Sequence, residues 1–297
     1  MKIIITGGTG FTGKRVLPLL KDQGHSIRCL TREKDNFKLI EKYGFEPYQC
    51  DVKDLSSLQS AFKDFDALIN IMSLGFGDAP NLISAIKQSS IKRALFVSTT
   101  AIETKLNAKT KVIRLDAEKK IKELSIKWTI LRPTMIFGDI DDRNIIKLIK
   151  FLKKMPFVII PGTGKFMQQP VDVKDVASAI VNAFFSDTTY SKTYNLSGAN
   201  PLTFNDLIKQ TATALKVKRP ILHIPVTPVI WIFSLLEKIM TKPPLKAEQI
   251  LRLLENKNFS HIEAYSDFEF KPKEFKDVIK QEVEQLNQYI LKSTSKT

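Results

Sequence analysis

Short apolar runs alternate with segments of helical periodicity over the first 135 residues of the chain. Within each run the hydrophobic residues are consecutive, which is typical of strands buried on both faces of a parallel sheet. We expect these strands at Lys2–Thr6, Ser26–Thr31, Phe45–Gln49, Ala67–Ile71, Ala94–Ser98 and Trp128–Leu131. The helical patterns between them lie near residues 12–22, 35–43, 55–63, 80–90 and 112–125. This alternation predicts an α/β fold with a doubly wound parallel sheet and helices on both faces.

The pattern becomes mainly helical after Pro133. One more strand is predicted at Thr193–Leu196. The further helices are predicted at Asn144–Lys154 and Asp175–Phe185 and near residues 203–215, 229–240, 246–255 and 273–291. We therefore expect a sheet domain made of residues 1–135 and 170–190. A smaller, mainly helical C-terminal lobe, made of residues 136–169 and 191–297, would close over a crevice at the sheet.

The net charge of the chain, which has 297 residues, indicates which binding partners to expect. The chain carries 46 Lys and Arg against 31 Asp and Glu, a formal net charge of +15. Such a balance favours anionic partners, namely phosphates or an acidic membrane surface. The basic residues lack the interleaved aromatic residues of a nucleic-acid surface, so no nucleic acid is expected as a partner.

The cysteines, the histidines and the N-terminal segment argue against a disulfide-rich, metal-binding, secreted or membrane-spanning protein. Two cysteines, Cys29 and Cys50, rule out a disulfide scaffold. The three histidines are scattered without metal-ligand spacing, so no metal site is expected. The sequence has no signal-peptide pattern and no apolar stretch of about 18 residues. We expect a cytoplasmic protein, with a peripheral position on the inner face of a membrane as the alternative.

The most specific motif is Thr6-Gly7-Gly8-Thr9-Gly10-Phe11-Thr12-Gly13, between the first strand and the first helix. Gly7 permits a tight turn, Gly10 lets the backbone approach a pyrophosphate, and Gly13 allows the helix to pack closely on the sheet. The N-terminus of that helix directs unpaired N–H groups at the phosphates. The motif therefore predicts a dinucleotide site.

The end of the second strand indicates which dinucleotide binds. An acidic residue there would accept hydrogen bonds from the adenosine ribose and repel a 2′-phosphate. Here the strand ends in Thr31-Arg32, with no acid before Glu33. Arg32 offers a planar fork of donors to a phosphate. We therefore expect NADP(H) as the cofactor in preference to NAD(H).

The glycine spacing resembles that of the short-chain dehydrogenase/reductase superfamily, particularly its extended and atypical branches. The motifs Cys50-Asp51-Val52, Ser98-Thr99-Thr100, Leu131-Arg132-Pro133 and Pro170–Ala177 extend the resemblance over about residues 1–200. It implies a Rossmann-type domain, with Asp51 and Val52 beside the adenine and Ile71 against the middle of the cofactor. The expected cofactor-contacting residues are Gly7, Thr9, Gly10, Phe11, Thr12, Gly13, Thr31, Arg32, Asp51, Val52, Ile71, Ser98, Arg114 and Pro133.

The catalytic tyrosine of this superfamily is missing. Its Tyr-x-x-x-Lys pair would fall at Thr110 and Arg114, and no tyrosine occurs between Tyr48 and Tyr190. An aliphatic hydroxyl does not ionise near neutral pH, and arginine cannot relay a proton. Thr100 matches the Ser/Thr position that polarises a carbonyl, so Thr100 and Arg114 are the expected catalytic residues. The whole pattern resembles a bacterial group related to the nucleotide-binding accessory subunit of respiratory complex I.

Two functions remain open from sequence. One is an oxidoreductase or epimerase-like enzyme that acts on an unknown small molecule. The other is a non-catalytic NADP(H)-binding sensor, or a membrane-associated accessory or assembly protein. The missing tyrosine favours the second, whereas a second lobe with a crevice favours the first.

Two segments of the second half suggest a further contact. Residues 143–165 contain six basic residues and no acid, and residues 229–240 are strongly apolar with Trp231 among them. For residues 143–165 a solvated helix face is the favoured interpretation, with attraction to a phosphorylated substrate as one alternative. For residues 229–240 internal packing, including a lid over the substrate, is favoured, with docking on a partner as one alternative. Peripheral contact with an anionic membrane through both segments is the other alternative. Gln168 and Gln169 are expected to face the substrate.

Overall fold

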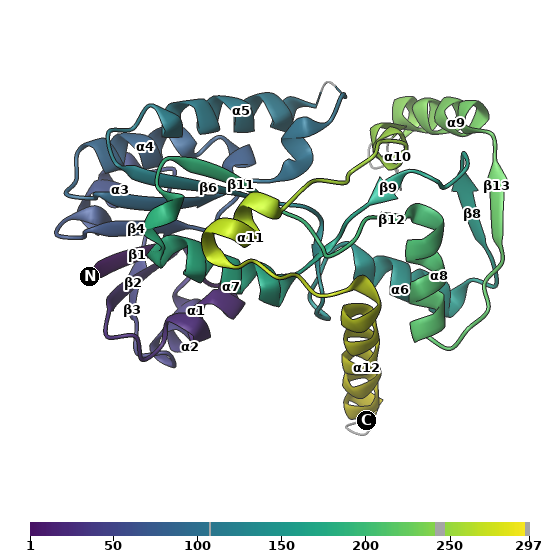
Figure 1. The fold of residues 1–297 in the computed structure, drawn as a ribbon, viewed down its shortest axis with the longest axis horizontal. Coiled ribbons are helices and arrows are strands. Elements are labelled where there is room, and N and C mark those ends of the chain that lie inside the picture. Colours follow the sequence, from purple (N-terminus) through teal and green to yellow (C-terminus); the bar gives the residue numbers. More distant parts are fainter. Residues whose placement is uncertain (107, 241–246, 295–297) are drawn as a thin grey trace.

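A parallel sheet of seven strands forms the core of the larger part of the protein (Figure 1). The computed structural model describes residues 1–106, 108–240 and 247–294. The strand order is β11-β6-β5-β4-β1-β2-β3, so the chain winds outward from β1 in both directions. This order confirms the predicted doubly wound sheet. The strands are β1 (Lys2–Thr6), β2 (Ser26–Thr31), β3 (Glu46–Gln49), β4 (Ala67–Asn70), β5 (Arg93–Val97), β6 (Lys127–Pro133) and β11 (Lys192–Leu196).

Helices cover both faces of this sheet because its central strands are apolar on both sides. Every residue of β4 and β5 is buried. One face packs against α1 (Gly13–Leu20), α2 (Phe37–Glu41), α7 (Val173–Phe185) and α11 (Ile262–Phe268). The other face packs against α3 (Leu55–Phe62), α4 (Ala79–Lys87) and α5 (Lys109–Lys122). Short 3-10 turns are η1 (Lys34–Asn36), η2 (Leu74–Phe76), η3 (Thr100–Glu103) and η4 (Asp187–Thr189).

The second lobe lies beside the sheet and is built mainly of helices (Figure 1). Its helices are α6 (Ile145–Lys154), α8 (Phe204–Ala214), α9 (Val226–Ile239), α10 (Ala247–Leu253) and α12 (Phe275–Thr294). Its strands form pairs, namely β7 (Ile136–Phe137) with β10 (Val171–Asp172), β8 (Val158–Pro161) with β13 (Ile221–Ile224), and β9 (Met167–Gln168) with β12 (Leu202–Thr203). Apolar residues of α6, α8 and α12 form a core of their own. The mainly helical C-terminal lobe is thus present as predicted.

The boundary expected at residue 190 differs from the observed division of the chain. β11 pairs in parallel with β6 and belongs to the large sheet, because Tyr194 and Leu196 are buried in its core. The unpredicted helix α11 also packs on this part, through Ala264 and Phe268. The helix expected near residues 246–255 corresponds to α10, and residue 246 lies outside the described residues.

Candidate functional site

The glycine loop after β1 is held in a tight turn. Gly7 has a φ of +74°, and its carbonyl accepts a hydrogen bond of 3.1 Å from the N–H of Gly10. A Cβ atom on Gly13 would lie 2.2 Å from the carbonyl oxygen of Gly7. Only glycine at position 13 therefore lets α1 begin this close to the loop.

The first amides of α1 are available to a ligand. Within the described chain, the N–H groups of Phe11, Thr12 and Gly13 have no hydrogen-bond partner, and the Thr12 side chain does not cap the helix. Backbone N–H groups at a helix N-terminus carry partial positive charge and favour bound anions. The loop therefore provides the donors that a pyrophosphate needs.

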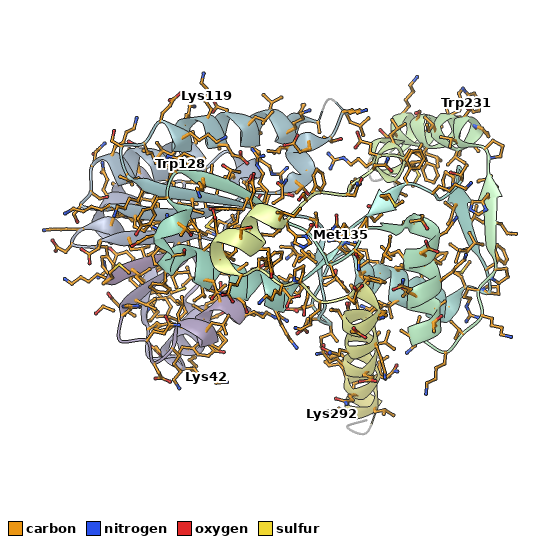
Figure 2. All side chains as sticks on the ribbon, viewed as in Figure 1. Lys42, Lys119, Trp128, Met135, Trp231 and Lys292 are labelled. Atoms are coloured by element: carbon orange, nitrogen blue, oxygen red, sulfur yellow. The ribbon has the colours of Figure 1, made fainter. Side chains whose placement is uncertain are left out.

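A cleft of about 890 Å³ extends from this loop to the second lobe. Its volume is at the upper end of the range for ligand sites, which fits a dinucleotide together with a second small molecule. Met135 lines the cleft and lies between the two parts of the protein in Figure 2. The second lobe contributes Arg143, Asn144, Phe166, Arg252, Leu254, Glu255, Asn256, Lys257 and Phe259.

The structure brings six of the fourteen expected cofactor residues to this cleft. The expected residues that line it are Gly7, Gly10, Phe11, Thr12, Gly13 and Ile71, together with the expected catalytic Thr100. Those that do not line it are Thr9, Thr31, Arg32, Asp51, Val52, Ser98, Arg114 and Pro133.

Arg32 extends into solvent beyond the end of β2. It is exposed, and no ion pair is formed by its side chain among the described residues. Its neighbour Thr31 is buried, and the Thr31 hydroxyl accepts hydrogen bonds from the N–H of Glu33 and from Asn36 Nδ2. Thr31 thus shapes the turn, whereas Arg32 is accessible to a ligand. On the next loop Asp51 is exposed, and Val52 lines a small separate pocket.

Ser98 belongs to a buried polar network instead of the cleft. Its hydroxyl donates a hydrogen bond of 2.6 Å to the Glu118 carboxylate, which also forms an ion pair with Arg132. Thr100 lies at the start of η3, lines the cleft and donates to the Pro133 carbonyl at 3.4 Å. Of these two residues, only Thr100 lines the cleft.

The position of the missing tyrosine lies outside the cleft. Thr110 is exposed near the start of α5, and Arg114 packs its guanidinium against η2. A Cβ atom on Gly75 would lie 2.7 Å from Arg114 Cζ, so Gly75 leaves the space that the guanidinium fills. Burial, and to a lesser extent the nearby Arg252, lowers the pKa of Arg114. Neither residue of the expected pair lines the cleft.

Among the described lining residues there is no Tyr, His, Cys or Asp side chain. The groups that can gain or lose a proton are Glu103, Lys105, Glu255 and Lys257. Glu255 is engaged, because its carboxylate accepts hydrogen bonds from the Thr104 hydroxyl at 2.6 Å and from the Lys105 N–H at 2.7 Å. These bonds join the second lobe to the loop after η3.

Lys257 is held at the cleft by its backbone. Its N–H donates to the Met167 carbonyl at 2.8 Å, and the Asn256 side chain accepts from the Met167 N–H at 2.9 Å. Burial lowers the pKa of the Lys257 ammonium, with Glu255 opposing that shift and Arg252 adding to it. The group therefore releases a proton more readily than an exposed lysine does.

Sequence reasoning missed the second-lobe side of the site. Arg143 belongs to the basic segment 143–165 and to a stretch that carries the family resemblance, and Lys257 belongs to no motif, so the sequence assigns neither residue to the site. Gln169, expected to face a substrate, instead donates to the Gly198 carbonyl at 2.7 Å and accepts from the Phe259 N–H at 2.9 Å. It supports the segment that carries Lys257. Gln168 is likewise buried outside the cleft lining.

Known proteins resemble this chain in both sequence and fold. Residues 7–187 match the model of a family described as NAD(P)H-binding. A mitochondrial NADH dehydrogenase [ubiquinone] 1 alpha subcomplex subunit 9 from Dictyostelium discoideum is 26% identical over 73% of this chain and 66% of its own length. The chain thus spans slightly less than two thirds of that relative. Phenylcoumaran benzylic ether reductase TP7 from Nicotiana tabacum is 27% identical over 70% of this chain and 72% of its own length.

Among solved structures, the fold is similar to that of a variant UDP-glucuronic acid 4-epimerase from Bacillus cereus, in complex with UDP-4-deoxy-4-fluoro-glucuronic acid and NAD. The TM-score is 0.76 at 15% identity, over 97% of this chain and 100% of the other. At that identity the likeness shows the fold alone. The family match covers more than half of the chain and includes the whole glycine loop from Gly7 onward. The chain therefore belongs to the NAD(P)H-binding family, which confirms the predicted resemblance to NAD(P)-binding dehydrogenases and reductases.

Proposed function

We propose that this protein binds NADP(H) along the glycine loop and catalyses hydride transfer to or from a small molecule held by the second lobe. It would act as an oxidoreductase or an epimerase-like enzyme of the atypical kind. The observation that supports this is a continuous cleft, lined by Gly10 and Phe11 on one side and by Arg143 and Lys257 on the other. A cofactor and a substrate would there lie side by side.

The chain's own groups account for cofactor binding. The amides of Phe11, Thr12 and Gly13 would hold the pyrophosphate, and Arg32 would bind the 2′-phosphate of the adenosine ribose. An exposed arginine at the end of β2, in place of an acid, supports NADP(H) over NAD(H).

Lys257 is the group best suited to supply a proton in place of the absent tyrosine. When bound, the nicotinamide supplies a hydride to the carbon of a substrate carbonyl. The ammonium of Lys257 would give its proton to the carbonyl oxygen, so that an alcohol forms, and the neutral amine would regain a proton from water. The Thr100 hydroxyl would orient the same oxygen by a hydrogen bond.

Fluorescence of bound NADPH tests this proposal. We expect the emission to disappear with multiple turnovers when the protein meets a suitable member of a panel of ketones, aldehydes and nucleotide-sugar ketones. The Lys257→Met variant should bind NADPH and lose most of that turnover. Failure of the protein to bind NADPH would contradict the proposal, whatever the substrate panel contains.

A second candidate function is a non-catalytic NADP(H)-binding sensor or accessory protein. The lack of Tyr, His, Cys and Asp among the described lining residues favours it. Three relatives are also named as a subunit of NADH dehydrogenase. In that case NADPH would bind tightly without oxidation by any carbonyl compound. Its binding would also slow amide exchange in the second-lobe segment that carries Glu255 and Lys257.

A further inference from the structure

Helix α9 exposes the apolar face that a helix normally buries. Val229 is its only buried residue. Trp231, Ile232, Leu235 and Ile239 are 69%, 50%, 44% and 72% exposed. Their spacing of three and four places them on one side of the helix. This is the reverse of the usual arrangement, in which the apolar stripe packs on the core.

The neighbouring strand pair adds to this surface. Leu222 of β13 pairs with Ile159 of β8, so both side chains lie on the same face, and Ile224 follows two residues later. Ile159, Leu222 and Ile224 are 51%, 49% and 37% exposed. In Figure 1 both strands lie at the end of the molecule farthest from the seven-stranded sheet, and α9 follows β13 across that end. We call these seven residues the apolar tip: Ile159, Leu222, Ile224, Trp231, Ile232, Leu235 and Ile239.

The charge around the apolar tip is positive. Lys147, Lys150 and Lys154 are exposed on α6, where Phe151 between them is itself 41% exposed. On α9, Lys238 stands beside Glu237, so the charges of these two exposed residues offset each other. Arg219 precedes β13, where its Nε donates to the Leu152 carbonyl. Residues 143–165 contain no acid.

These charges decide what covers the apolar tip. A second copy of this chain would bring another +15 and another basic rim, so electrostatic repulsion opposes self-association. Aliphatic side chains with a tryptophan, bordered by lysines, match the boundary between headgroups and acyl chains of an anionic bilayer. None of the helices in the described part of the chain has the length and hydrophobicity of a membrane span.

We propose that the apolar tip docks on the surface of an anionic phospholipid bilayer, with α9 lying in the interface and the α6 lysines against the headgroups. The seven-stranded sheet would then lie at the end of the molecule away from the lipid. This inference is independent of the proposed catalytic function.

Trp231 makes the proposal directly measurable. The chain has two tryptophans, and Trp128 is only 8% exposed, so a change in emission on mixing with vesicles reports mainly on Trp231. With phosphatidylcholine–phosphatidylglycerol vesicles at low salt, we expect a blue shift of the emission, quenching by brominated lipids and co-sedimentation. High salt or pure phosphatidylcholine vesicles should weaken all three.

Two matched variants distinguish binding through the apolar tip from nonspecific hydrophobic adsorption to vesicles. Ile239→Asp should lower the vesicle partition coefficient by about tenfold or more. Ile262→Asp changes a residue that is 70% exposed on α11, beside the large sheet, and should leave partitioning unchanged. Both changes lie on the surface, and thermal melting checks that each variant is folded.

Three results would overturn the proposal. One is the absence of binding to anionic vesicles at low salt, and another is equal loss of binding in both variants. The third is a dimer in gel filtration that Ile239→Asp dissociates, because the apolar tip would then be an interface between copies of the chain.

Discussion

At the residue scale, the arginines near the glycine loop differ in whether they form an ion pair with a carboxylate. Arg15 pairs with Asp139 and Asp141, and Arg28 pairs with Glu46 at 2.8 Å. Arg32 has no such partner among the described residues, although it lies at the end of β2. A cation free of carboxylates can give its full hydrogen-bonding capacity to a phosphate.

Replacing Arg32 by Ala should therefore change cofactor preference. We expect the Kd for NADPH to rise by about tenfold or more, because a charge-assisted pair with the 2′-phosphate is lost, while the Kd for NADH changes by less than about twofold. Fluorescence titration measures both constants. Lys42→Ala, which removes an exposed lysine nearby in the chain, is the control and should alter neither. Equal weakening of both nucleotides in the Arg32 variant would refute the assigned role.

Lys257 allows a test that separates binding from turnover. In Lys257→Met we expect kcat for carbonyl reduction to fall by about 100-fold, the usual effect of losing a general acid, with little change in the Kd for NADPH. Lys257→Arg should not restore kcat, since a guanidinium does not release its proton near neutral pH.

The pH dependence of the reduction rate gives a second test of Lys257. Reduction needs the protonated ammonium, and burial lowers the pKa of Lys257 from its usual value. The wild-type rate should therefore decline as pH rises, at a lower pH than an exposed lysine would give. That limb of the profile should vanish in Lys257→Met. An unchanged profile would assign the proton to another group.

At the element scale, α12 carries a buried acid into the second lobe. Glu282 accepts a hydrogen bond of 3.1 Å from the Gly138 N–H, and burial beside Asp142 raises its pKa to about 9. Asp142 in turn accepts from the Ile146 N–H at 2.9 Å, at the start of α6. The folded lobe therefore holds a proton on Glu282 at neutral pH.

This proton makes stability depend on pH. The folded-state pKa lies above that of the unfolded chain, so the contribution is complete below the ordinary glutamate pKa and is lost as pH rises toward about 9. Glu282→Gln keeps an acceptor for Gly138 and offers a donor to Asp142. We expect it to differ from wild type by less than about 1 kcal/mol at pH 5, and its stability advantage to grow by about 4 kcal/mol between pH 5 and pH 8.5. Urea unfolding at both pH values measures this difference, and a loss of stability at pH 8.5 would show that Glu282 is ionised in the fold.

The elements also show what a sequence can and cannot predict. The strands β1 and β2 were predicted residue for residue, because short apolar runs bounded by turns admit few interpretations. The two-residue strands β9 and β12 were missed, since tertiary contacts alone hold them. The loop side of the cleft follows from one contiguous motif. The Lys257 side is assembled from separate segments of the chain, so no spacing reveals it.

At the scale of the whole molecule, hydrogen bonds and ion pairs join the sheet part of the protein to the second lobe, on either side of the cleft. Glu255 bonds to the loop after η3, and Arg15 of α1 pairs with Asp139 and Asp141 on the loop before α6. Lys273, just before α12, pairs with Asp172 and Asp175 at the start of α7. A dinucleotide on the sheet would then lie beside a substrate on the second lobe. The β8 and β13 part of the apolar tip lies at the end of that lobe farthest from the seven-stranded sheet.

Calorimetric titration of the full chain with NADPH and NADH tests the central claim most directly. The account predicts one NADPH per chain, bound more tightly than NADH, with that difference lost in Arg32→Ala. Absence of binding heat for both nucleotides at two temperatures would contradict it, as would tighter binding of NADH.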